Sequence, residues 1–171
     1  MSFLFGPDPK LDLEATVPGD IRVDHVATEN GDIDVHDATG PLEADTANGE
    51  IDARGVDGDV VAESTNGAVS VAGASGDVRA ETTNGSIDIT AAAGGDLTAE
   101  STNGTVTVRA PPTLDAELTL STTNGEVSLK GFGDADATSE DSIEVTLGDG
   151  SRRIRAETTN GTVTVRSETG E

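Results

Sequence analysis

The sequence predicts an all-β protein, a right-handed parallel β-helix (β-solenoid) with about 18 residues per coil and Asn-Gly corners. The first observation is an Asn-Gly dipeptide that recurs at Asn30, Asn48, Asn66 and Asn84, each time after 18 residues. The second is that apolar and polar residues alternate on both sides of each dipeptide. The third is the constant period itself, which suits strands that pair from coil to coil at about 4.8 Å.

Residues 1–20 are predicted to form a flexible N-terminal tail with an apolar tip. Two of the three phenylalanines lie in its first five positions, and prolines follow at positions 7, 9 and 18. Such a tip suggests a membrane contact through Phe3, Leu4 and Phe5. An equally good alternative is that these residues fold back and cover the open first coil. Three large apolar side chains at roughly 1.5 to 3 kcal/mol each attach one molecule weakly, so many copies would have to act together.

Residues 21–166 are predicted to form the solenoid. Inward residues are expected six, four and two positions before each Asn, which in the third copy are Val60, Ala62 and Ser64. A second strand follows the corner, and its first inward residue in this copy is Val69. Five of the corners have an acidic residue three positions before the Asn, and these residues are expected on the outer wall: Asp45, Glu63, Glu81, Glu100 and Glu157.

The corner asparagines are expected to stack into a ladder in which each side-chain amide bonds to the next. The predicted ladder comprises Asn30, Asn48, Asn66, Asn84, Asn103, Asn124 and Asn160. An Asn-Gly pair is also a strong hairpin signal because both residues tolerate positive φ, but three equal spacings favour the solenoid. A coil of 18 residues fits a flattened two-sided coil or a three-sided one with a short third strand near residues 71–76. We favour the three-sided form.

The end of the repeat is less regular. Asn124 and Asn160 are 36 residues apart, and residues 131–142 show no alternation, which predicts a loop. Residues 143–156 are expected to form a coil without an Asn corner, or a hairpin. The last predicted strand, residues 162–166, is followed only by a short C-terminal tail at residues 167–171.

An uncapped last strand would leave an edge to which a second copy could pair, so end-to-end assembly is expected there. Arginines gather near this end and would reduce the repulsion between acidic copies. The residues assigned to this contact are Phe132, Arg155, Val163, Val165 and Arg166.

The composition is strongly acidic. Thirty-three Asp and Glu residues against ten Lys and Arg residues give a formal net charge of -23, which argues against nucleic acid as a partner. A surplus of this size suits molar salt, where the Debye length is about 3 Å, and predicts a halophilic source. The absence of Cys leaves the compartment open, but the chain has no recognisable signal or membrane-spanning stretch, so a cytoplasmic location is expected.

No catalytic, cofactor or metal site is predicted. His25 and His36 lie 11 residues apart without a third ligand in a zinc spacing, so a surface or edge role is expected for both. Calcium-binding repeats and EF-hand loops do not occur despite the many Asp residues. Nothing in the sequence singles out a nucleophile, a base and an oxyanion donor, so we expect that the protein is not an enzyme.

The recurring units Thr-x-Asn-Gly-x-Val-x-Val, with Gly-Asp-Val/Leu-x-Ala-Glu between them, resemble a bacterial and archaeal family of β-solenoid domains described as adhesins, whose function is unknown. The resemblance covers residues 21–166 and is specific in its Asn-Gly spacing. With its short length, apolar tip and acidic balance, the chain also resembles the halofilins, archaeal counterparts of the bactofilin cytoskeletal proteins.

The resemblance to bactofilins implies nonpolar filaments that form by end-to-end stacking of β-helices without nucleotide. It also implies attachment to the cytoplasmic membrane by an N-terminal tail, to which only Phe3, Leu4 and Phe5 correspond. The chain departs from the bactofilins in its Asn-Gly corner, since bactofilins have a hexapeptide rhythm instead. The polymer contacts therefore cannot be carried over residue by residue.

The leading hypothesis is a non-enzymatic, self-assembling scaffold on the inner face of the membrane that helps set cell shape. Its expected partners are other copies of the chain and the membrane surface. The alternative is a cell-surface adhesin or envelope module. A carbohydrate-active enzyme is a remote third hypothesis, because glycoside-cleaving β-helices use aromatic sugar platforms that this chain lacks.

Overall fold

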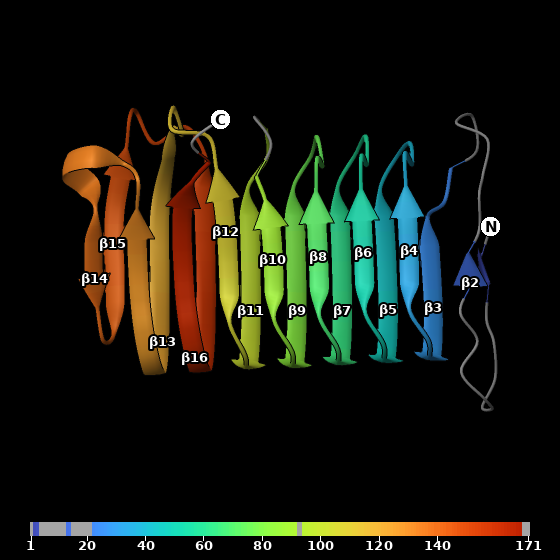
Figure 1. Cartoon of the computed structure of the whole chain (residues 1–171). Helices are drawn as coiled ribbons and strands as arrows, with labels where there is room; N and C mark the ends of the chain where they lie inside the picture. The colour runs from blue at the N-terminus through green and yellow to red at the C-terminus, as the bar shows by residue number, and fades with distance from the viewer. Residues whose placement is uncertain (1, 4–12, 15–21, 92–93, 169–171) are drawn as a thin grey trace.

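The computed structural model describes residues 2–3, 13–14, 22–91 and 94–168, which form an all-β protein (Figure 1). Its strands are β1 (Ser2–Phe3), β2 (Leu13–Glu14), β3 (His25–Asn30), β4 (Ile33–His36), β5 (Leu42–Asn48), β6 (Ile51–Arg54), β7 (Val60–Asn66), β8 (Val69–Ala72), β9 (Val78–Asn84), β10 (Ile87–Thr90), β11 (Leu97–Asn103), β12 (Val106–Ala110), β13 (Ala116–Lys130), β14 (Ala137–Ser139), β15 (Ser142–Leu147) and β16 (Arg153–Ser167). A 3-10 turn, η1 (Gly133–Ala135), is the one helix in this part of the chain. The predicted fold class is confirmed.

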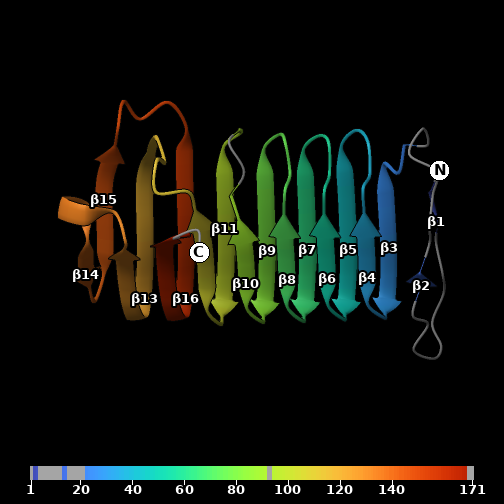
Figure 2. The same cartoon turned by 45° about the horizontal axis from the view of Figure 1, so that its top comes forward.

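Successive coils stack so that each strand pairs in parallel with the equivalent strand of the next coil (Figure 1 and Figure 2). One row runs β1, β3, β5, β7, β9, β11, and the other runs β2, β4, β6, β8, β10, β12. Leu42 pairs with Val60 in the first row, and Ile51 pairs with Val69 in the second. Parallel pairing throughout β3 to β12 rules out antiparallel hairpins at these corners.

The early coils also have a short third side, which follows the second strand. Ala38 and Val56 are buried there. The backbone N–H of Asp57 donates to the carbonyl of Ala38 at 2.8 Å, and that of Ser75 donates to the carbonyl of Val56 at 3.0 Å. Thr39 and Asp57 form a parallel bridge. The coil is therefore three-sided, with two long sides and a short one, as we favoured from its length.

The last coils do not stack in chain order. β16 pairs in parallel with β11 and β12 on one edge, through Leu97 with Ile154 and Val106 with Val163, and with β13 on its other edge. The C-terminal strand thus lies inside the rod, between the coil of β11 and β12 and the coil of β13 (Figure 1). The expectation that residues 162–166 form an uncapped end is wrong, because the apolar columns of β16 match the coils on both sides.

An antiparallel cap covers the coil of β13. β15 pairs with the first half of β13, with Val145 opposite Leu118, and β14 pairs with the second half, with Thr138 opposite Ser128. This cap is seen beyond β13 at the end of the rod remote from the N-terminus (Figure 2). The rod therefore ends in β14 and β15 and not in the last residues of the chain.

Two predictions for the irregular region need correction. Residues 131–142, expected to be a loop, contain η1 and β14. Residues 143–156, expected to be a coil or a hairpin, contain β15, which pairs with β13, and the start of β16, which lies on the opposite edge of β13. Between β15 and β16 the chain crosses from one edge of β13 to the other, because β15 pairs with one edge and β16 with the opposite one.

The core consists of aligned columns of small and medium apolar side chains at the predicted inward positions. The column six before the corner contains Leu42, Val60, Val78, Leu97, Ile154 and Leu118, all buried. The column four before it contains Ala44, Ala62, Ala80, Ala99, Ala156 and Leu120, all 0% exposed. Alanine in most coils allows the two rows to approach closely, so the rod encloses an apolar core without Trp or Tyr.

The corner glycines are needed for close packing between coils. A Cβ atom on Gly67 would overlap the carbonyl oxygen of Gly49, and one on Gly85 would overlap that of Gly67. Of the seven corner glycines only Gly161 has a positive φ, at 154°. The Asn-Gly pair therefore serves contact between neighbouring coils here, and not the positive φ angles of a hairpin turn.

Candidate functional site

The corner asparagines form a continuous ladder along the rod. In six of the seven, Nδ2 donates to the Oδ1 of the neighbouring Asn at 2.9 to 3.0 Å, and Asn30 at the end accepts. In spatial order the ladder runs Asn30, Asn48, Asn66, Asn84, Asn103, Asn160 and Asn124. All seven predicted members are confirmed, and their spatial order follows the insertion of β16. The ladder fixes the register of the coils and hence the alignment of every outer side chain.

Buried hydroxyl groups lie beside the ladder, two residues before six of the seven corner asparagines. Thr46 Oγ1 donates to the carbonyl of Gly31 at 3.1 Å, and Thr122 Oγ1 donates to that of Gly161 at 3.0 Å. Equivalent bonds from Ser64, Thr82, Ser101 and Thr158 measure 3.1 to 3.2 Å. These bonds satisfy the hydroxyls that the sequence pattern placed inside, as expected for buried polar groups.

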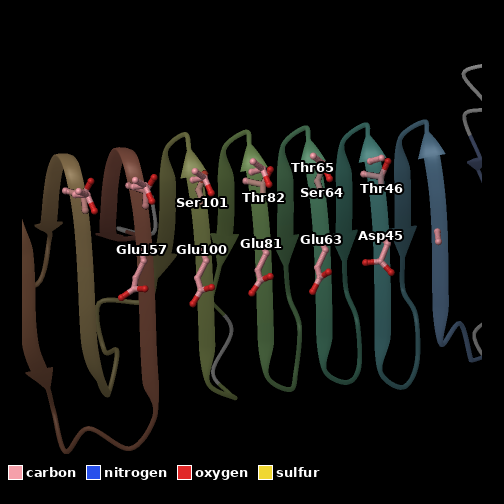
Figure 3. A pocket seen from close by; sticks show the side chains of 18 of the residues that line it. Asp45, Thr46, Glu63, Ser64, Thr65, Glu81, Thr82, Glu100, Ser101 and Glu157 are labelled. Carbon is pink, nitrogen blue, oxygen red and sulfur yellow. The ribbon is translucent and has the colours of Figure 1, made fainter.

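A groove of about 790 Å³ crosses the outer face of the first strand row, next to the corners (Figure 3). One side is an acidic row, Asp45, Glu63, Glu81, Glu100 and Glu157. The other side is a hydroxyl row of exposed side chains, Thr65, Thr83, Thr102, Thr159 and Thr123. Because the strands are in register, equivalent groups repeat at about 4.8 Å. This array can hold cations or form hydrogen bonds with a polar ligand.

Cations neutralise the acidic row only in part. Arg79 forms an ion pair with Glu81, and Arg155 pairs with Glu157 at 2.9 Å. The hydrogen bond to Glu157 is the main cause that raises the pKa of Arg155. Among residues 22–91 and 94–168, no ion pair reaches Glu63. The middle of the row therefore keeps uncompensated negative charge.

A histidine joins two carboxylates at the end of the acidic row nearest to β3. Nδ1 of His25 lies 3.4 Å from Oε2 of Glu43 and 3.7 Å from Oδ2 of Asp45. Burial is the main cause that raises the pKa of Asp45, while His25 lowers this pKa and Glu43 raises it. His36, by contrast, lies on β4 with Nε2 2.6 Å from Oδ1 of Asp34.

The cluster around His25 was missed in the sequence because its carboxylates come from the next coil. Known zinc spacings join ligands that are close along the chain, whereas Glu43 lies one full period after His25. The 18-residue period is the signal that could have found it, because it places His25 opposite Glu43 in the parallel register.

The residues expected to mediate end-to-end assembly do not share an exposed end. Val163 and Val165 are 0% exposed within β16, whose two edges are both paired. Arg155 and Arg166 belong to the same inserted coil. Phe132 lies at the cap, where it is partly buried against the core. The assignment of the four β16 residues to a terminal strand edge is therefore wrong.

The predicted membrane contact falls largely outside the described residues. Phe3 is in β1, whose backbone pairs with β3 opposite Val26, as the fold-back alternative expects for this residue. Leu13 of the predicted tail is in β2 and pairs with Ile33. Leu4 and Phe5 lie outside the described part of the chain. No helix among the described residues has the length and apolar character needed to cross a membrane.

A comparison with protein families gives a match over most of the chain. The matching family is Toastrack DUF4097, a domain of unknown function, and the match covers residues 16–166. No curated protein and no solved structure gives a significant match. The matched range includes the strand rows from β3 and β4 onward, the groove and the cap, and it agrees with the expected family of β-solenoid domains. On this evidence the chain belongs to the Toastrack DUF4097 family.

Proposed function

We propose that the protein is a non-enzymatic, self-assembling β-solenoid scaffold, a bactofilin-like cytoskeletal polymer that associates with the cytoplasmic face of the membrane and helps set cell shape. The observation that carries the proposal is the rod. Its coils stack in a common register, and their corner Asn amides are hydrogen-bonded to one another. A stack of this kind has no built-in length, because a free strand edge can accept another strand.

The free edge that we assign to assembly lies on β15, in place of the predicted edge on β16. Thr122 N donates to the carbonyl of Asp141 at 2.8 Å, which fixes the residues whose backbone groups face β13. In an antiparallel pair these residues alternate, so the N–H and C=O groups of Glu144 and Thr146 point away from β13. No strand in the described part of the chain pairs with this outer side.

Acidic side chains surround this edge and make assembly dependent on salt. Glu140, Asp141 and Glu144 are all exposed. Equal charges on two approaching copies repel each other in dilute buffer, and the repulsion weakens in molar salt because the Debye length falls to about 3 Å. We therefore expect monomers at low salt and polymers in molar KCl.

Two substitutions of Glu144 test the contact in opposite directions. Glu144→Pro removes an outward N–H and no bond to β13, so it should abolish polymers and preserve the fold. Glu144→Gln keeps the N–H and removes the charge, so it should shift assembly to lower salt. Electron microscopy and sedimentation velocity at low and molar KCl give the readout, and circular dichroism checks each fold. Wild-type protein that stays monomeric in molar KCl, or a proline variant that still polymerises, contradicts the proposal.

The membrane part of the proposal is supported by the apolar tip, and Leu4 and Phe5 test it without altering β1. Wild-type polymers should sediment with zwitterionic vesicles in molar KCl, because many tips act together. Leu4→Gln with Phe5→Gln should abolish vesicle binding and leave polymers intact, whereas Leu11→Gln is the matched control in the same tail. Unchanged vesicle binding by the double variant contradicts membrane attachment. Digestion of the protein by protease added to intact cells would instead favour the surface-adhesin alternative.

A further inference from the structure

The solenoid period brings one imidazole and two carboxylates together on the outer face of β3 and β5. His25 pairs in register with Glu43, and Asp45 lies two residues further along β5, so the three side chains project from the same face. One ligand atom from each side chain lies within 4.8 Å of the other two. The groups come from two neighbouring coils whose positions are fixed by the amide ladder.

The separations between these atoms fit a small divalent cation. Nδ1 of His25 is 3.4 Å from Oε2 of Glu43 and 3.7 Å from Oδ2 of Asp45. Ligands bonded at about 2.0 to 2.1 Å in a tetrahedron lie roughly 3.4 Å apart. A mixed set of imidazole and carboxylate favours zinc, since magnesium and calcium prefer oxygen ligands only. We propose that His25, Glu43 and Asp45 form a Zn²⁺ site whose fourth position is open to water.

The local charge favours a cation over an empty cluster. Two carboxylates face a single imidazole, and no Arg or Lys of the described chain forms an ion pair with Glu43 or Asp45. The side chain of His25 is 34% exposed, so an ion can reach it from solvent.

A proton on His25 is the competing occupant, because an imidazolium would also hold the two carboxylates. Both occupants fit the same distances, but only zinc binding saturates at one ion per chain at constant pH. His36 provides a matched control, because it pairs with the single carboxylate of Asp34 and lacks a second one in its described ion pairs.

Isothermal titration of the chelator-treated full chain with ZnCl₂ in molar KCl tests the site, since high salt suppresses diffuse binding to the acidic surface. We expect one ion per chain with a dissociation constant on the order of micromolar. His25→Ala and Glu43→Gln should each weaken zinc binding by about tenfold or more, whereas His36→Ala should bind as the wild type does. Circular dichroism shows whether each variant keeps its fold.

Nuclear magnetic resonance of the histidine rings during the same titration identifies the ligand. The His25 ring signals should shift and saturate at one equivalent of Zn²⁺, while those of His36 should stay in place. Equal zinc affinity of His25→Ala and the wild type would overturn the site. A loss of zinc affinity in His36→Ala as large as that in His25→Ala would also overturn it. Displacement of zinc by a similar concentration of MgCl₂ would also overturn it. Polymer formation is not measured, so these outcomes are independent of the scaffold proposal.

Discussion

The corner residues act on the neighbouring coil more than on their own. An Asn amide accepts a bond from one neighbour and donates to the other, and the adjacent Gly leaves room for the carbonyl of the coil beside it. The buried Ser or Thr two positions earlier binds the same carbonyl. The effect of a substitution should therefore depend on how many neighbours that residue has in the stack.

Replacing an asparagine in the middle of the ladder should cost more stability than replacing one at its end. Asn84 donates to Asn66 and accepts from Asn103, whereas Asn30 at the end of the ladder accepts from Asn48. Asn84→Ala should lower the free energy of unfolding by about 1 to 2 kcal/mol, and Asn30→Ala by roughly half as much. Urea titration in molar KCl measures both. Equal losses of unfolding free energy in the two variants would show that the ladder hydrogen bonds do not cause the destabilisation.

At the level of elements, β16 joins the two parts of the rod. Its first half continues one strand row and its second half continues the other, with β11 and β12 on one edge and β13 on the opposite edge. In a solenoid each coil contacts only its neighbours, so a defect is expected to spread no further than adjacent coils. β16 is consequently the element on which the cap depends.

A cavity in β16 should loosen the capped end and leave the other end intact. Ile154 and Leu42 occupy the same column and are each 1% exposed. Ile154→Ala should cost about 2 to 5 kcal/mol, and hydrogen exchange should rise in β11, β13 and β16 but not in β5 and β7. Leu42→Ala is the matched control and should give the reverse pattern. Uniform loss of protection in both variants would contradict nearest-neighbour behaviour.

For the whole molecule, the net charge of -23 opposes the compact state. The strands bring carboxylates of the acidic row to about 4.8 Å from one another, where unit charges repel by roughly 1 kcal/mol in water. Arg79 and Arg155 relieve this repulsion beside them. Glu63 lies between Asp45 and Glu81, and no Arg or Lys in the described part of the chain forms an ion pair with it. Screening by salt should therefore stabilise the rod.

Glu63→Gln should reduce the dependence of stability on salt. We expect it to raise the free energy of unfolding by roughly 0.5 to 1 kcal/mol in dilute buffer and by close to zero in molar KCl, because the repulsion it removes is then screened. Glu81→Gln, which removes a charge already paired with Arg79, is the control and should give no gain. Thermal and urea unfolding across a KCl series measure both effects. A gain from Glu63→Gln that persists in molar KCl would point to a cause other than charge.

The coils could be predicted because the sequence repeats locally. The order in which the last coils stack could not be predicted. Columns such as Val60 and Val78, together with the Asn-Gly period, determine strands, corners and inward faces from the sequence. The sequence cannot order β13 and β16, because Leu118 and Ile154 are both large and apolar and either can occupy the position beside Leu97. The cap decides between them, since β14 and β15 pair with β13.

The sequence period predicts that equivalent outward residues form rows along the rod. The His25 cluster, in contrast, cannot be found from motifs defined by spacing along the chain. Glu63 and Glu81 follow directly from the period, because each lies three residues before its Asn. The cluster depends on contact between coils, in which Glu43 lies opposite His25. A motif defined by spacing within one loop does not detect such a contact.

The position of β16 has a consequence for synthesis on the ribosome. The nascent chain emerges from its N-terminus, so the coils up to β12 can stack while translation continues. β13 then emerges before β16, although β16 is the permanent neighbour of β11 and β12. That neighbour exists only once residue 167 has been made, so the final arrangement of the rod is reached after β16 has left the ribosome and not coil by coil.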